Sequence, residues 1–485
     1  MKRFTCHFPF DSVDLPAISK GSKAPPMNVV ARLAVYVFCL LALGLLAMTP
    51  PAWAEDIITS YQLAAESDPT LRAAEAARNA SLEVAPQSLA NLLPQLGFDG
   101  RVSRDRFHPR NDGDGRTTYY TNKNYRVQLR QAVYQRADFI QLKQADSIIA
   151  QANAEYEAAV QELILRVATR YFAVLGAQDN VDFVKADKSA VGRTLEQARQ
   201  RFDVGLSSIT DVADAQARYD LVISDEISAE NLLADTYEAL RELTGQPQKH
   251  LARLKTEIPL KAPEPAFQDE WVTTALDQNL NVLAAEAATE SARQEIQIQR
   301  SGHYPTVDVT ADWEYKDNQF GGVVPLERND SSIGVQFNLP IYQGGRVVSR
   351  TRESRYRFQE AQELLEQQRR ATEREARNNY RGVLTNISKV KALQQAVISN
   401  ETLQDAAEAG FEVGTRTIVD VLDAQRELLR ARRDYARSRY DYLLDSLRLK
   451  QSAGILSEED LVMINALLQE DSVTTDPLQT RPFKP

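Results

Sequence analysis

One stretch of 15 residues occurs twice in this chain, and the duplication limits the available folds more than any other feature. The first copy, residues 202–216, reads FDVGLSSITDVADAQ, and the second, residues 411–425, reads FEVGTRTIVDVLDAQ. The copies align without a gap, at an offset of 209 positions. Shorter matches before them have similar offsets. A period of about 210 residues indicates a duplicated domain rather than a solenoid of short repeats.

Each copy predicts a tight turn between two helices. Gly205 and Gly414 lie where a helix C-cap needs a positive φ angle, which glycine adopts at the lowest cost. The residues that can cap the helix that follows are Ser207, Ser208, Thr415 and Thr417. Two aspartates then come three positions apart and share one helix face: Asp211 with Asp214, and Asp420 with Asp423. For a single copy, an interaction with the helix dipole would suffice as an explanation.

The N-terminus has the pattern of a secretory signal peptide. Arg32 precedes an apolar run over residues 33–47, and an Ala-x-Ala site ends at Ala54. This pattern predicts cleavage after Ala54 and a signal peptide over residues 1–54. The run is short for a transmembrane helix, which needs about 20 apolar residues. Residues 1–26 are unusual before a signal peptide, and Met27 would be a normal start.

The exported chain is acidic and free of cysteine. Cys6 and Cys39 both precede the predicted cleavage site, which excludes disulfides and cysteine metal sites after export. Val37 and Phe38 are not the small residues of a lipoprotein box, so we do not expect lipidation at Cys39. Cleavage removes five basic and two acidic residues and changes the net charge from −10 to −13. Such an exported chain is a poor candidate for binding nucleic acid.

Each half contains two stretches of alternating polarity. A helical stretch, about 56–92 or 269–302, leads to Pro94 or Pro305, and the alternating stretches follow, with polar loops over 106–124 and 316–332. A period of two with one apolar face predicts strands. A half-buried sheet of a soluble protein would show the same period. Strands of about 10 residues with aromatic residues toward their ends also suit a barrel wall between lipid and water.

A long helix follows the strands in each half, roughly over 136–201 and 344–409. The repeated turn comes next, and then a shorter helix, roughly over 207–245 and 416–454. A helix of about 66 residues extends ~100 Å, and the two shorter helices of a half cover a similar distance end to end. This arithmetic suggests a tube wall. Residues at steps of three and four after the second turn are typical of a polar coiled-coil seam: Ile418, Val421, Gln425, Leu428, Arg432 and Tyr435.

The predicted organisation is a first repeat over 55–245, a linker over 246–268 and a second repeat over 269–465. A polar tail over 466–485 is expected to be disordered from about residue 469. Two strands in each half give four per chain, which cannot close a barrel, and open sheet edges are not tolerated in lipid. Three chains would supply twelve strands, so we expect a homotrimer.

The second repeated turn carries a family resemblance. GTRTIVDVLDA at 414–424 and YQGG at 342–345 resemble the TolC family of outer-membrane efflux and type I secretion channels, over about residues 56–465. The resemblance implies a mainly α-helical fold with β-strands. A coiled-coil tunnel would extend into the periplasm, and four strands per chain would join a trimeric twelve-stranded transmembrane β-barrel.

The function implied by the resemblance is that of an exit duct in the outer membrane of a Gram-negative bacterium. It would export small toxic compounds, proteins or both, and open by untwisting of its periplasmic helices. Its partners would be a periplasmic adaptor (membrane fusion) protein, an inner-membrane pump of the RND or ABC type and outer-membrane lipid. No cofactor, metal or nucleic acid is implied.

The resemblance also assigns roles at the closed end of the tunnel. Asp420 and Asp423 match two aspartate rings, where six carboxylates around one axis should repel, attract cations and have raised pKa values. Arg416 matches the arginine that ties neighbouring coiled coils, with Thr210 and Asp211 as partners. Phe411 departs from the family, which commonly has a tyrosine bonded to the counterpart of Asp211. Without that hydroxyl, we expect closure to depend more on Arg416.

Two other function classes fit less well. A periplasmic coiled-coil adaptor would need one helical hairpin flanked by split lipoyl-like strands, whereas this chain predicts two hairpins and paired alternating strands. An enzyme is disfavoured because His108, His250 and His303 are isolated and lack a catalytic motif. The aspartate pairs could suggest a carboxylate hydrolase, but a helix tip offers no pocket for a substrate. We therefore expect no catalytic activity.

Overall fold

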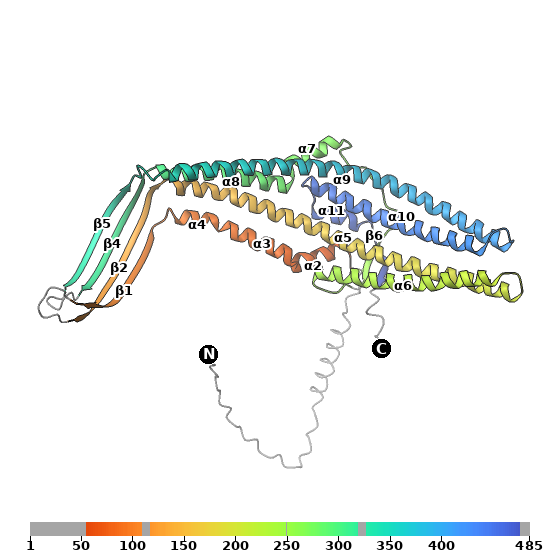
Figure 1. Ribbon diagram of the computed structural model, residues 1–485. Coiled ribbons are helices and arrows are strands. Elements are labelled where there is room, and N and C mark those ends of the chain that lie inside the picture. Colours follow the sequence, from red (N-terminus) through yellow and green to blue (C-terminus); the bar gives the residue numbers. More distant parts are fainter. Residues whose placement is uncertain (1–54, 109–116, 249, 319–325, 476–485) are drawn as a thin grey trace, which may run out of the picture. The chain divides into compact units, whose positions relative to one another are not determined.

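The computed structural model describes residues 55–108, 117–248, 250–318 and 326–475. All of them belong to one compact unit, Ala54–Pro485. The predicted signal peptide, its cleavage site and the alternative start at Met27 lie outside the described residues. Within this unit the long strands lie at one end and the two helix tips at the other (Figure 1).

The same order of elements occurs in both halves of the unit. The first half comprises α2 (Ile57–Ser67), α3 (Pro69–Leu82), α4 (Val84–Ala90), β1 (Gln95–Phe107), β2 (Thr118–Gln135), α5 (Arg136–Asp203) and α6 (Ile209–Thr244). The second comprises α7 (Gln268–Gln278), α8 (Leu280–Arg300), η1 (Ser301–His303), β4 (Thr306–Asn318), β5 (Leu326–Asn338), α9 (Arg346–Glu412) and α10 (Ile418–Ser452). Three short elements complete the unit: β3 (His250–Leu254), α11 (Glu458–Asn465) and β6 (Leu468–Thr475).

The helical stretches at the start of each half are interrupted, where the sequence predicted one continuous stretch in each. Asp68 ends α2, and its carboxylate accepts the Leu71 amide at 3.0 Å to cap α3. Pro69 follows at the first position of α3, where its missing N–H is not needed. Burial opposes ionisation of Asp68, but a 2.7 Å bond from Arg166 and the Leu71 amide outweigh it and lower the pKa of the carboxyl. Asn279 divides α7 from α8 in the same way.

The four long strands form one antiparallel sheet in the order β1-β2-β4-β5. Apolar side chains on one face are exposed, with Leu96 at 74% and Ile333 at 81%. The other face carries the ion pairs Arg126–Glu314 and Arg130–Asp308, each at 3.1 Å. The predicted loops, 106–124 and 316–332, were too wide, because the backbone ladder continues through the polar residues of 118–124 and 326–332.

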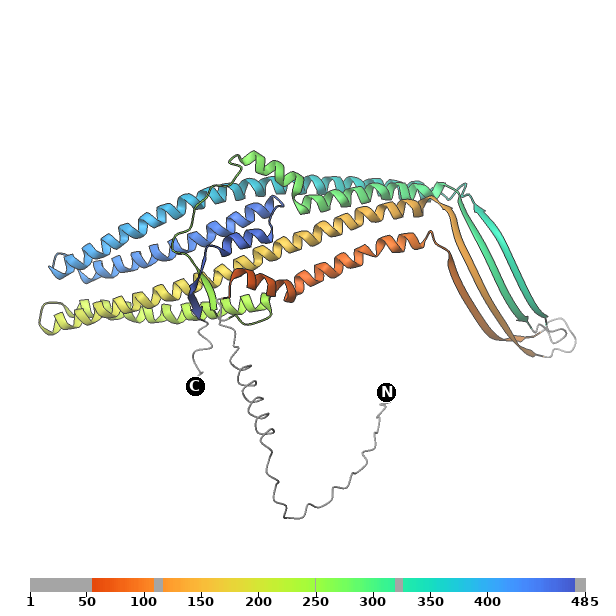
Figure 2. The same cartoon turned by 180° about the vertical axis from the view of Figure 1, so that it is seen from behind.

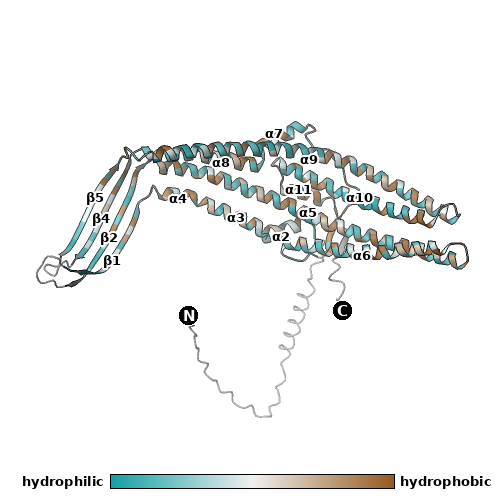
Figure 3. Ribbon diagram, viewed as in Figure 1, coloured by the Kyte–Doolittle hydropathy of each residue, from teal (hydrophilic) through white to brown (hydrophobic). Residues whose placement is uncertain are grey.

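The long helices form two hairpins. The first hairpin is α5 with α6, the second is α9 with α10, and α5 also contacts α10 (Figures 1 and 2). Polar and apolar residues alternate along these helices (Figure 3), as a wall with a solvated face requires. The buried core follows α5, with Leu163, Ile164, Tyr171 and Phe172 among its largest fully or nearly fully buried side chains. Within the described ranges, no helix combines the length and the apolar composition that a membrane crossing requires.

The predicted disordered tail is wrong for its first residues. Leu468–Thr475 forms β6, which pairs antiparallel with β3 from the segment between the repeats. The amide of Glu55 also donates to the carbonyl of His250 at 2.6 Å. A short polar strand has no hydrophobic alternation to reveal it, and its partner lies more than 200 positions earlier in the chain. Residues 476–485 lie outside the described part.

Candidate gate site at the paired helix tips

The two repeated turns have the same backbone. Gly205 and Gly414 adopt φ angles of 77° and 78°, in the left-handed region that favours glycine. The Leu206 amide donates to the Arg201 carbonyl at 2.8 Å, and the Thr415 amide donates to the Gly410 carbonyl at the same distance. We call residues 202–216 the first tip and residues 411–425 the second tip. Each tip is therefore closed by its own backbone before any neighbour is considered.

Each tip begins its second helix with a capping box. Ser208 caps α6 and Thr417 caps α10, and each hydroxyl accepts the amide three residues on at 3.2 Å. The reciprocal bonds run from the Ser208 amide to Asp211 at 3.1 Å and from the Thr417 amide to Asp420 at 2.8 Å. These bonds fix both aspartates on the first helical turn.

In the single chain, the hydrogen bonds of the caps lower the pKa values of the two capping aspartates. Bonds from the Thr417 amide and hydroxyl, together with the nearby Arg416 guanidinium, lower the pKa of Asp420. A bond from the Ser207 hydroxyl, with those from Ser208, lowers the pKa of Asp211. Within the single chain these donors favour the ionised form of Asp420. The raised pKa expected for six carboxylates around one axis stays a prediction.

The structure brings Arg416, Asp420 and Asp423 together on the second hairpin. They line one shallow groove. The guanidinium of Arg416 lies 3.7 Å from the Asp420 carboxylate and its side chain is 57% exposed. Asp423 pairs with Arg426 at 3.0 Å. All three therefore lie at the surface of the isolated chain.

The predicted partners of Arg416 lie on the first tip instead. Thr210 contacts the Ser208 hydroxyl, and Asp211 is bonded to Ser207 and Ser208. Within one chain Arg416 thus pairs with Asp420 rather than with either of them. A tether from Arg416 to Thr210 and Asp211 of a neighbouring chain stays a prediction.

Phe411 is held by a residue that the sequence reasoning missed. Arg201, in the last turn of α5, donates to the Phe411 carbonyl at 2.9 Å and to the Glu412 carbonyl at 3.0 Å. Its guanidinium carbon lies 4.6 Å from the centroid of the Phe411 ring. The two hairpins of the chain are therefore linked at Phe411 without a tyrosine hydroxyl. The signal available in the sequence was that Arg201 aligns with Gly410 at the repeat offset.

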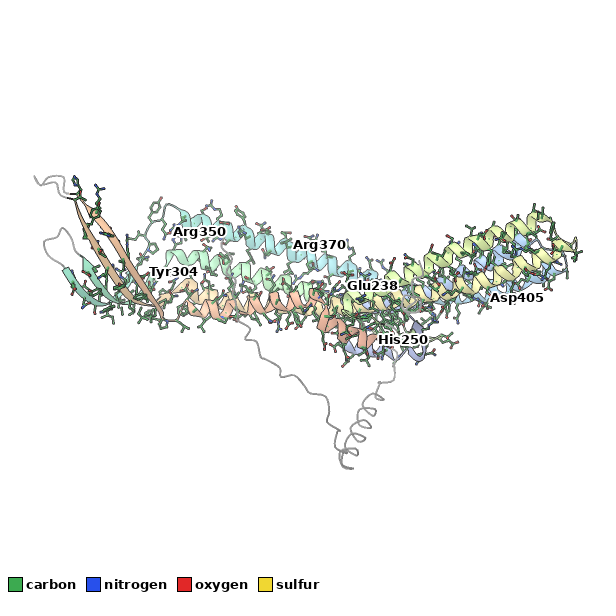
Figure 4. The ribbon with its side chains drawn as sticks, turned by 90° about the horizontal axis from the view of Figure 1, so that it is seen from below. Glu238, His250, Tyr304, Arg350, Arg370 and Asp405 are labelled. Carbon is green, nitrogen blue, oxygen red and sulfur yellow. The ribbon has the colours of Figure 1, made fainter. Side chains whose placement is uncertain are left out.

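The histidines considered as enzyme candidates lie apart from the tips. His250 belongs to β3 near the middle of the helical region, whereas Asp405 lies close to the tips (Figure 4). His303 belongs to η1, before β4. In the part of the chain that the structure describes, His, Cys, Asp and Glu residues form no group of three or more suited to a metal ion.

Comparisons with known proteins identify the family. The model of the outer membrane efflux protein family matches residues 60–246 and 271–455, which include both tips. Outer membrane protein TolC of Vibrio cholerae is 40% identical over 436 residues, covering 89% of this chain and 98% of the relative. Outer membrane protein TolC of Escherichia coli is 36% identical over 456 residues, covering 92% of this chain and 91% of the relative.

A solved structure supports the fold. The crystal structure of the outer membrane protein VceC from Vibrio cholerae matches with a TM-score of 0.68 at 21% identity, covering 82% of this chain and 96% of that one. The predicted fold class, mainly α-helical with four long strands per chain, is confirmed. So is the predicted location in the outer membrane of a Gram-negative bacterium. The chain belongs to the outer membrane efflux protein family.

Proposed function

We propose that three copies of this chain form an outer-membrane exit duct whose closed end is built from the paired helix tips. The family makes the chain an outer-membrane channel for export. The observation that carries the rest is the grouping of Arg416, Asp420 and Asp423 at the second tip, where they line one groove and remain exposed in the isolated chain. The duct exports small toxic compounds, proteins or both.

The sheet supports assembly from several copies. Among the described strands, β1 and β5 lie at the two edges of the four-stranded sheet. Backbone groups at an open edge cannot stay unpaired in lipid, so β1 of one copy needs β5 of another. Four strands from each of three chains make the predicted twelve-stranded barrel. The exposed apolar face would then lie toward lipid and the face with Arg126–Glu314 toward water.

The aspartates give the closed end its charge selectivity. The capping box holds Asp420 on the first turn of α10, where the amide and hydroxyl of Thr417 donate to its carboxylate. Asp423 follows one turn later on the same face. Three copies of this pair around one axis would attract cations and repel anions, as charged rings do in pores.

The duct needs partners because an outer-membrane passage has no access to ATP or to the inner-membrane proton gradient. We propose an inner-membrane pump of the RND or ABC type and a periplasmic adaptor protein that joins it to the tips. The alternative in which this chain is itself the adaptor is set aside, since it has two hairpins and a four-stranded sheet and matches the channel family.

Substitution of Arg416 tests the gate assignment. Arg416→Ser removes the proposed tether between neighbouring chains, so the single-channel conductance of the trimer in a planar bilayer should rise. Arg437→Ser, an exposed arginine further along α10, is the matched control and should leave conductance unchanged. Unchanged conductance with Arg416→Ser would place the closing contact elsewhere.

A further inference from the structure

The two tips differ in where they carry an arginine. At the offset of 209, Arg201 aligns with Gly410, and Ser207 aligns with Arg416. The first copy thus has its arginine before the turn, on the last turn of α5. The second copy has its arginine after the turn, beside the cap of α10. The two turns have the same backbone, so the two tips differ mainly in which hairpin each arginine contacts.

Arg416 folds back over its own hairpin because position 410 is a glycine. A Cβ atom at Gly410 would lie 2.6 Å from Cγ of Arg416, so any other residue there would require Arg416 to move. The aliphatic part of Arg416 occupies that space, and the guanidinium ends beside Asp420. Arg416 therefore makes its contacts on the second hairpin, and its side chain stays 57% exposed in the single chain.

Arg201 reaches the other hairpin of the same chain. Its two terminal nitrogens donate to the carbonyls of Phe411 and Glu412, at 2.9 and 3.0 Å. These are among the last carbonyls of α9, at the negative end of the helix dipole. The Phe411 carbonyl also accepts the Gly414 amide at 3.2 Å, so Arg201 uses its second acceptor position. The planar fork of arginine matches two adjacent carbonyls, and the cation also lies over the Phe411 ring.

The two phenylalanines at equivalent positions of the repeat differ in how far their side chains are buried. Phe411 is 8% exposed, whereas Phe202, at the same position of the first tip, is 41% exposed. Further links between the hairpins lie nearer the strands. Gln425 donates to the Thr194 hydroxyl at 3.3 Å, and the Tyr440 hydroxyl donates to Asp179 at 2.7 Å. Arg201 therefore extends a series of links between the hairpins to the tip.

We propose that Arg201 is the latch that holds the two hairpins of one chain together at the closed end. Phe411 and Glu412 are its receiving site. This inference rests on the proposed function, in which the tips form the gate. Two hairpins in each of three chains would alternate around the axis and create two kinds of junction. Arg201 serves the junction within a chain, and Arg416 serves the junction between chains. Phe411 thus joins the hairpins through its carbonyl and ring rather than through a hydroxyl.

The latch predicts that Arg201→Ala opens the channel partly. The single-channel conductance should rise about as much as with Arg416→Ser, and the double variant should exceed either, because the two residues act at different junctions. Arg201→Lys should give an intermediate rise, since lysine keeps the charge but loses the fork. The matched control is Arg199→Ala, because Arg199 donates to Gln216 of its own hairpin at 2.6 Å. The amount of trimer in detergent reports whether each variant folds.

A distance measurement tests the latch without reference to conductance. Val204 and Val413 occupy equivalent positions on the two tips and are 69% and 75% exposed. Spin labels on cysteines at both positions, in trimers diluted with unlabelled chain, should move apart in Arg201→Ala but not in Arg199→Ala.

The outcomes separate the latch from the gate. An unchanged distance and conductance in Arg201→Ala, with a rise in Arg416→Ser, would overturn the latch and leave the proposed gate intact. No conductance change in any of these arginine variants would overturn both. Separation of the tips together with a higher conductance in Arg201→Ala alone would support the latch.

Discussion

At the scale of single residues, Asp420 has two roles in one position. Its carboxylate closes the capping box of α10 and also belongs to the proposed ring of acids. The residue types at the tips were enough to predict the caps and the positive φ angles of Gly205 and Gly414. The donors of Thr417, which lower the pKa of Asp420 in the single chain, were not part of the expectation, which concerned repulsion between chains and stays a prediction.

The ring predicts block by cations. With both Asp420→Ala and Asp423→Ala, multivalent cations added from the periplasmic side should no longer block the current, because the carboxylates that attract them are gone. The measurement is single-channel current in a planar bilayer. Glu238→Ala, which changes an exposed acid of α6 away from the tips, is the matched control and should preserve block. Block that persists in the double variant would locate the cation site elsewhere.

The contact made by Arg201 could not be predicted from the residues around it in the sequence. Its position in the last turn of α5 was included in the predicted helix, but its partners lie on α9, 210 positions away. Contacts between the two hairpins depend on how one hairpin packs against the other. The spacing of apolar residues within a helix does not specify that packing. Comparing the two copies position by position, with attention to the arginines, would have singled it out.

At the scale of elements, the long helices were predicted well, and the strands and the interrupted helices at the start of each half less so. The long helices α5 and α9 extend over residues 136–203 and 346–412, against predictions of 136–201 and 344–409. Their ends are marked by local signals, namely the strand exit and the tip glycine. The strands extend beyond the alternating apolar residues, because backbone pairing does not need apolar side chains. The pairing of β6 with β3 had no local signal.

The link between α5 and α10 at Tyr440 predicts a pH-dependent loss of stability. Tyr440→Phe keeps the ring stacked on Phe172, at a centroid distance of 5.5 Å, but removes the donor to Asp179. A carboxylate left without its donor should cost about 1–3 kcal/mol per chain. Burial raises the pKa of Asp179 above the ordinary value, and losing the hydroxyl raises it further. The ionised form is thus the one disfavoured by folding.

The sign of the pH effect follows from that shift. Below about pH 3.9, the ordinary pKa of aspartate, the carboxyl is protonated in the folded and the unfolded chain, and the deficit of Tyr440→Phe should be smallest. As the pH rises through the raised pKa, the deficit should grow to its full value. Thermal unfolding in detergent at pH 4 and pH 7.5 measures it. Tyr435→Phe, which keeps its ring beside Arg439, is the control. A deficit independent of pH would exclude Asp179 as its cause.

At the scale of the whole molecule, the proposed trimer depends on the edges of the sheet. Residues 55–485 contain no cysteine, so cysteines introduced along β1 and along β5 should form disulfides between chains, giving dimers and trimers on denaturing gels. The control pair is Val127→Cys with Trp313→Cys, which already face each other in β2 and β4 and should link only within a chain. Monomers from every β1 and β5 pair would contradict closure by three copies.

Each tip is stabilised by its own residues, with a glycine of positive φ at the end of one helix and a capping box at the start of the next. Neither the turn nor the capping box uses an atom from the neighbouring hairpin. Breaking the links between hairpins therefore leaves each helix intact to its last turn. In the proposed trimer, the aperture would widen by outward tilting of intact hairpins, and its closure would require no refolding of a helix.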